Sequence, residues 1–123
     1  MKKILYSCIA LLLIVTGCKK NQAGGPSIIN GEVKHHDNFI PGATVYIKFN
    51  AREFPGRDST VYDEKTTADA NGSFSFKVYK GDYYLYATGI DDRPPYEYVN
   101  GGIPVTLRHK EEVNLIVAVT EKH

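Results

Sequence analysis

The most regular alternation of hydrophobic and polar residues occurs in two neighbouring segments, residues 73–79 and 83–88. In each segment every second residue is apolar, and a period of two places successive side chains on opposite faces of a β-strand. Asn71-Gly72 precedes the first segment and Lys80-Gly81-Asp82 separates the two, and both are typical turn sequences. The pattern therefore predicts a β-hairpin with an apolar inner face.

Further strands are predicted from the same pattern, in residues 27–34, 43–49, 60–67, 103–108 and 112–120. Residues 60–67 are polar on both faces, which favours an edge strand, where charge discourages aggregation. Residues 112–120 are partly apolar on both faces, so we expect a central strand there. Residues 89–102 contain paired prolines and several glycines, and we expect them to form a long connection.

These seven strands predict an all-β fold, a seven-stranded antiparallel β-sandwich of the transthyretin-like or Ig-like kind. After residue 18, no part of the sequence has the spacing of apolar residues that is typical of an α-helix. The whole chain has 123 residues, which is enough for one domain. We assign that domain to residues 27–123.

The N-terminus has the pattern of an export signal. Met1-Lys2-Lys3 is followed by an apolar run, residues 4–15, which is shorter than the ~20 residues that span a bilayer. The run ends in Val15-Thr16-Gly17-Cys18, which resembles the lipobox of bacterial lipoproteins. The resemblance implies a cleaved signal helix in residues 1–17 and lipidation of Cys18. Residues 18–26 are polar and contain glycine, so we expect them to form a flexible tether.

The same N-terminal segment also leads to expectations about the cellular location of the protein and about its disulfides. Lys19 rather than aspartate comes after Cys18, which by the same resemblance favours the outer membrane, facing the periplasm. Both cysteines, Cys8 and Cys18, lie in this segment, so we expect no disulfide in the mature protein. A formal charge of +1 gives no indication of nucleic-acid binding.

Four motifs occur in order along the chain, and together they resemble the carboxypeptidase regulatory-like family. They are Ile29-x-Gly31-x-Val33, Pro41-Gly42-Ala43-x-Val45, Thr67-Ala68-Asp69-Ala70-Asn71-Gly72-x-Phe74-x-Phe76 and Gly81-x-Tyr83-x-Leu85-x-Ala87. The resemblance implies a transthyretin-like sandwich that acts as an accessory module without catalytic residues of its own. In the related collagen-adhesin domains a lysine and an asparagine can form an amide bond. Lys34 and Asn114 are of those types, but the accompanying glutamate motif is missing.

Two groups of residues could bind a metal ion. Adjacent residues on a strand point to opposite faces, so we expect His35-His36 to form a solvated turn rather than to share an ion. Asp91-Asp92, with Asp58 or Glu97, lacks the alternating spacing of a calcium loop. No nucleophile motif and no phosphate-binding loop is present in the sequence. We therefore expect no metal, no cofactor and no enzymatic activity.

Tyrosine is the most informative surface residue in the sequence. Exposed aromatic side chains can mark a binding surface, although ordinary cross-strand packing is the more common reason for them. The candidate partner or ligand residues are Tyr79, Tyr84, Tyr86, Tyr96 and Tyr98.

The sequence thus predicts a non-catalytic, lipid-anchored cell-envelope lipoprotein that serves as a structural or protein-interaction module. The alternative is a lipoprotein that binds a carbohydrate or another small ligand through its tyrosines.

Overall fold

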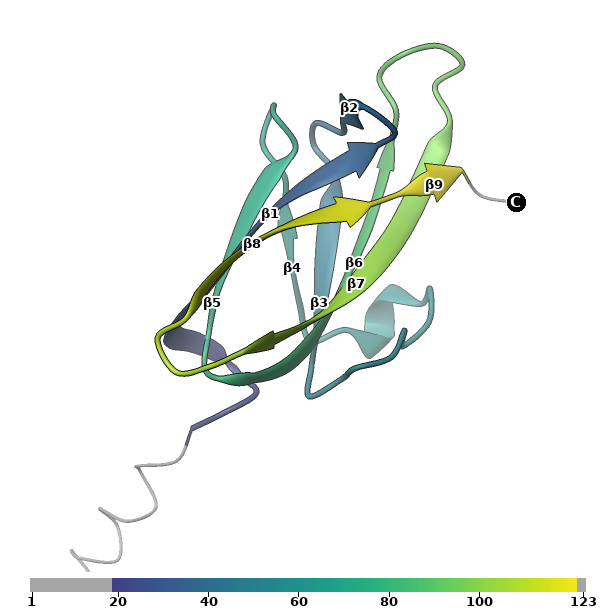
Figure 1. Cartoon of the computed structure of the whole chain (residues 1–123). Coiled ribbons are helices and arrows are strands. Elements are labelled where there is room, and N and C mark those ends of the chain that lie inside the picture. Colours follow the sequence, from purple (N-terminus) through teal and green to yellow (C-terminus); the bar gives the residue numbers. More distant parts are fainter. Residues whose placement is uncertain (1–18, 122–123) are drawn as a thin grey trace, which may run out of the picture.

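The structure is a computed structural model that describes residues 19–121, so the expected signal peptide and Cys18 lie outside it. Two β-sheets pack face to face (Figure 1). One short 3-10 helix, η1 (Ser59–Val61), begins where the Asp58 carboxylate accepts a hydrogen bond from the Thr60 N–H. No helix in this part of the chain is long and apolar enough to cross a bilayer.

The first sheet is built around the longest strand, β1 (Ala23–His35). It also contains β2 (Asn38–Phe39), β5 (Ser73–Val78) and β8 (Glu112–Ala118). The second sheet has the order β4 (Glu64–Thr67), β3 (Thr44–Phe49), β6 (Gly81–Ile90), β7 (Tyr98–Leu107) and β9 (Thr120–Glu121). The predicted all-β sandwich is therefore confirmed, and each of the seven expected strands is present, with two short strands added.

The core lies between the sheets, and most of its members are inward-facing residues of the alternating segments, joined by three from outside them. Its members are Ile29, Val33, Ile40, Ala43, Val45, Ile47, Ala68, Phe74, Phe76, Val78, Tyr83, Leu85, Ala87, Val99, Leu107, Val117 and Val119. The inner faces predicted for residues 73–79 and 83–88 are thus correct, because burial follows directly from the period of two.

The hairpin predicted from those two segments is wrong. β5 pairs with β1 in the first sheet, whereas β6 pairs with β3 and β7 in the second. The turn at residues 79–80 therefore carries the chain from one sheet to the other. Alternation identifies which side chains face the core, but it contains no information about the neighbouring strand.

The description of the sheets as purely antiparallel is also wrong. β8 lies parallel to β1, in a register that pairs Ile28 with Glu112 and Lys34 with Ala118. Lys34 is consequently not opposite Asn114, which pairs with Asn30. Strand direction is set by the path of the chain between sheets, so the residues of a single strand do not reveal it.

We expected β4 to be an edge strand and β8 to be a central strand, and only the first expectation is correct. β4 pairs only with β3 among the described strands, so the predicted edge strand is confirmed. β8 pairs only with β1 in the same part of the chain, so the expectation of a central strand is wrong. The outward-facing Ile116 is 49% exposed, which explains why apolar residues on both faces misled the prediction.

Two expected irregular segments are shorter than predicted. β6 continues to Ile90 and β7 begins at Tyr98, so the connection expected over residues 89–102 is a loop of residues 91–97. β1 begins at Ala23, inside the expected tether, and Asn21 donates its backbone N–H to the Lys80 carbonyl at 2.9 Å. Glycine-rich sequences indicate loops on average, but Gly89, Gly101 and Gly102 are paired in strands, and Gly24 and Gly25 lie in a bulge of β1.

Candidate functional site

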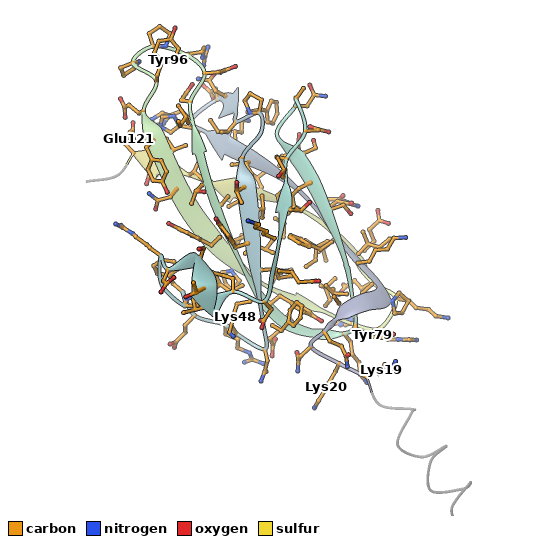
Figure 2. The ribbon with its side chains drawn as sticks, turned by 180° about the vertical axis from the view of Figure 1, so that it is seen from behind. Lys19, Lys20, Lys48, Tyr79, Tyr96 and Glu121 are labelled. Atoms are coloured by element: carbon orange, nitrogen blue, oxygen red, sulfur yellow. The ribbon has the colours of Figure 1, made fainter. Side chains whose placement is uncertain are left out.

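The five candidate tyrosines are spread over both ends of the sandwich and the outer face of its second sheet, where Tyr98 lies near Tyr86. Tyr79 lies at one end of the sandwich with Lys19 and Lys20, the first residues that the structure describes, whereas Tyr96 lies at the opposite end (Figure 2). We call these the proximal end and the distal end. The Lys19 ammonium lies 5.7 Å from the centroid of the Tyr79 ring, so a cation–π contact partly covers that ring. The structure therefore does not gather the tyrosines into one binding face.

Tyr84 and Tyr86 lie on the outer face of the second sheet, but only Tyr84 is half-exposed. Tyr86 is 3% exposed, so the prediction that it is available to a partner is wrong. The ring of Tyr62 stacks on it at 5.7 Å, Tyr46 lies at 6.3 Å, and Phe54 at 5.3 Å.

The loop between β3 and β4 explains this burial. It folds over the sheet, and residues 54 and 62 on it supply two of the three covering rings. Sequence reasoning did not single out Phe54, whose ring centroid also lies 6.0 Å from that of Tyr84. The one feature of the sequence that could have indicated this contact is a single phenylalanine in an otherwise charged loop.

The electrostatics of this aromatic cluster favour packing over chemistry. Burial raises the pKa of the hydroxyls of Tyr62, Tyr84 and Tyr86 above the ordinary value of 10. All three side chains are therefore neutral at physiological pH. This face stabilises the sheet, as cross-strand aromatic pairs do.

Tyr96 and Tyr98 are the tyrosines that the structure leaves open to solvent. Tyr96 is 62% exposed in the loop between β6 and β7, and Tyr98 is 47% exposed at the start of β7. Ile90 pairs with Tyr98 across the two strands and is 60% exposed. The distal end therefore presents three large, solvent-exposed apolar side chains.

His35 contradicts the expectation of a solvated turn. It is the last residue of β1, shares the inward parity of Val33, and is 5% exposed. Its Nδ1–H donates to Asp91 Oδ2 at 2.6 Å, and Asp91 is itself only 6% exposed. Asp91 is likewise buried rather than solvated, because it directly follows β6 and its carboxylate is turned toward His35.

The premise that the two histidines point apart is wrong as well. His36 has a φ of 55°, outside the strand region, so the alternation of side chains stops at His35. The two rings lie side by side with centroids 4.3 Å apart. His36 Nε2 is 3.4 Å from Glu121 Oε1, and His35 Nε2 is 3.2 Å from the same oxygen.

The charges in this group support one another. The hydrogen bond with Asp91 raises the pKa of His35, and the same bond lowers the pKa of Asp91. The Arg93 backbone N–H, which donates to Asp91 Oδ1 at 3.0 Å, lowers it further. The backbone N–H of Glu121 and then the His36 ring lower the pKa of the Glu121 carboxyl to about 2. Sequence reasoning did not connect Glu121 with the histidines, because they are far apart in the chain.

Comparisons with known proteins identify a fold rather than a family. No family model matches the chain, and no curated protein matches it. The major pilin subunit of Bacillus cereus is similar in structure, with a TM-score of 0.56 and 16% identity over 80% of this chain and 30% of the pilin chain. A DUF3823 family protein from Parabacteroides merdae has a TM-score of 0.45 and 20% identity over 80% of this chain and 48% of its own. The chain thus spans less than half the length of either protein, and the likeness to the pilin subunit shows an all-β, Ig-like sandwich.

Proposed function

We propose that this chain is a non-catalytic, lipid-anchored module of the bacterial cell envelope that contacts a partner protein through its distal end. The observation that carries the proposal is the exposure of Ile90, Tyr96 and Tyr98 at that end. Large exposed aromatic and aliphatic groups are enriched at the centres of protein interfaces. The resemblance to carboxypeptidase regulatory-like domains, with their accessory role, supports the same reading.

The position of the proposed anchor gives the module a direction. Cys18 immediately precedes Lys19, which lies at the proximal end with Lys20 (Figure 2). β1 has 13 residues and runs toward the distal end, so at ~3.3 Å per residue it covers about 40 Å. A lipid on Cys18 would therefore hold the exposed distal side chains well away from the bilayer surface.

Photocrosslinking in living cells tests this proposal. A photoreactive phenylalanine analogue is placed at position 96 or 98 of the full chain, and at position 79 as a matched tyrosine site near the anchor. We expect a discrete crosslinked protein from positions 96 and 98 and none from position 79. Crosslinks from position 79 alone, or from none of the three, would contradict a distal partner surface.

The alternative ligand is a carbohydrate, and the structure restricts where it could bind. Covered Tyr86 offers no stacking platform, whereas the exposed rings of Tyr96 and Tyr98 do. A glycan array probed with the full chain distinguishes this alternative from the protein partner. Glycan binding that is lost in the Tyr96→Ala/Tyr98→Ala variant would favour it, and the absence of any bound glycan would exclude it.

A further inference from the structure

Three potential metal ligands from distant parts of the sequence meet at the distal end. One ring nitrogen of His35, one of His36 and one carboxylate oxygen of Glu121 all lie within 4.8 Å of one another. His35 ends β1 of the first sheet, whereas Glu121 ends β9 of the second. The cluster therefore bridges the two sheets of the sandwich.

His35 Nε2 is the most informative atom of this cluster. It is buried and has no geometrically acceptable hydrogen bond, although Glu121 Oε1 lies 3.2 Å away as an ion-pair partner. A buried polar atom without a hydrogen bond carries an energetic cost and calls for an explanation. A cation seated between the nitrogen and the carboxylate would satisfy both.

The opposite side of the His35 ring is arranged as it is in metal sites. Nδ1–H donates to Asp91 Oδ2 at 2.6 Å, which leaves the lone pair on Nε2 in the neutral ring. Asp91 is held in turn by the Arg93 backbone N–H at 3.0 Å. A carboxylate behind a ligating histidine fixes its tautomer and orientation, and it is a common second layer around bound zinc.

We propose that His35, His36 and Glu121 bind one divalent transition-metal ion, with zinc as the ion that two imidazoles and one carboxylate fit best. Ligand atoms around tetrahedral zinc lie ~3.3 Å apart, given bond lengths of about 2.0–2.1 Å. The three ligand atoms, now within 4.8 Å of one another, must therefore move closer together when the ion binds. The side chains of His36 and Glu121 are 71% and 30% exposed, so they are free to make this movement. Asp91 is a positioning residue for His35 and does not itself bind the ion.

The ion would stabilise the distal end. Glu121 is held by β9, whose pairing with β7 joins Val99 to Glu121 and Asn100 to Thr120. A metal ion shared by Glu121 and His35 would fasten this two-residue pairing to the end of β1. The inference is independent of the proposed partner surface, since it concerns binding of an inorganic ion alone.

Calorimetric titration with zinc chloride tests the site. The full chain is purified in detergent without a polyhistidine tag and treated with a chelator before titration. We expect saturable binding of one ion per chain and a rise in Tm of about 10 °C at a hundredfold excess of zinc over its Kd. His36→Ala and Glu121→Gln, which alter side chains that are not buried, should each weaken zinc binding at least tenfold.

His109→Ala is the matched control, because His109 is an exposed histidine that lines a hollow at the proximal end with Lys20 and Lys80. It should bind zinc as the unaltered chain does. Equal affinity in all three variants, or an equal loss in His109→Ala, would overturn the proposal. With cobalt as a spectroscopic probe, bands from thiolate ligands would assign the ion to cysteines and would overturn it too.

Asp91→Asn separates positioning from a purely structural role. We expect a tenfold to hundredfold weaker affinity for zinc with an unchanged cobalt spectrum. The informative quantity is the rise in Tm that zinc causes, since a purely structural role would lower the Tm of the metal-free protein and leave that rise intact. An unaltered rise would remove Asp91 from the proposed site.

Discussion

At the scale of single residues, burial is decided by the local backbone as much as by side-chain type. His35 and His36 are identical residues in adjacent positions, yet the first is 5% exposed and the second has a side chain that is 71% exposed. The positive φ of His36 ends the strand and turns its ring back alongside that of His35. A sequence pattern assumes that the strand continues, so it places the two rings on opposite faces.

Tyr83 leads to a prediction on alkaline pH. The side chain is fully buried, its hydroxyl donates to the Tyr79 carbonyl, and burial raises the pKa of Tyr83 to about 12. An unfolded tyrosine ionises near the ordinary value of about 10. The unfolded chain therefore loses a proton first, and the stabilisation that Tyr83 provides is complete below about pH 10 and is lost as the pH rises toward 12.

Ultraviolet titration of tyrosinate, together with urea unfolding between pH 8 and 12, measures this effect. We expect the free energy of unfolding to fall above about pH 10. Tyr83→Phe should reduce the size of that fall, while Tyr96→Phe, at an exposed position, should leave it unchanged. Equal pH dependence in all three proteins would contradict the assignment.

At the scale of elements, the crossing of β8 from the first sheet to the second decides the shape of the distal end (Figure 1). The Val119 backbone N–H donates to the Lys34 carbonyl at 2.9 Å, and the chain then pairs with β7 as β9. Gly101 makes this approach possible, since a Cβ there would lie only 2.2 Å from the Ala118 carbonyl oxygen. That clash is with backbone, which cannot rotate away as a side chain can.

Gly101→Val should therefore destabilise the protein by about 3 kcal/mol, at the upper end of the usual cost of overpacking. The strain falls on the crossing that holds Glu121, so β9 should detach from β7. Urea unfolding and hydrogen exchange of the β9 amides measure these effects. Asn100→Ala, the neighbouring position on the same strand, should change the free energy of unfolding by less than about 1 kcal/mol. Similar losses in the two variants would show that the crossing tolerates a side chain at position 101.

At the scale of the whole molecule, the two ends of the sandwich have different surroundings. The proximal end carries Lys19 and Lys20, whereas the distal end carries Tyr96 and Glu121 (Figure 2). The lipid that we propose on Cys18 would attach the module at its proximal end, and the exposed apolar side chains of the distal end would then be available to a partner away from the membrane.

Cys18→Ser tests the attachment. A single acyl chain binds a bilayer only marginally, and two or more give stable anchoring. We expect the unaltered protein to incorporate labelled palmitate and to sediment with membranes, and the variant to lose the label. Ser7→Ala, inside the apolar run, is the matched control and should be labelled normally. Palmitate incorporation that survives Cys18→Ser would show that Cys18 is not the acylated residue.

The sequence by itself determined the fold class and the identity of the core. Side chains alternate along every strand, so hydrophobic periodicity alone identified the inward faces of residues 73–79, 83–88 and 43–49. Charge on both faces identified β4 as an edge strand for a similarly local reason. These properties depend on residues within one strand, which is why one strand's sequence is enough to predict them.

Only the tertiary structure decided which strands are neighbours and which side chains meet. The apparent hairpin separates into two sheets, β8 lies parallel to β1, and Tyr86 is covered by rings from another strand and a loop. His35 and Glu121 from the ends of β1 and β9 meet Asp91 from the loop after β6. Such contacts depend on the path of the chain between strands, and hydrophobic periodicity does not record that path.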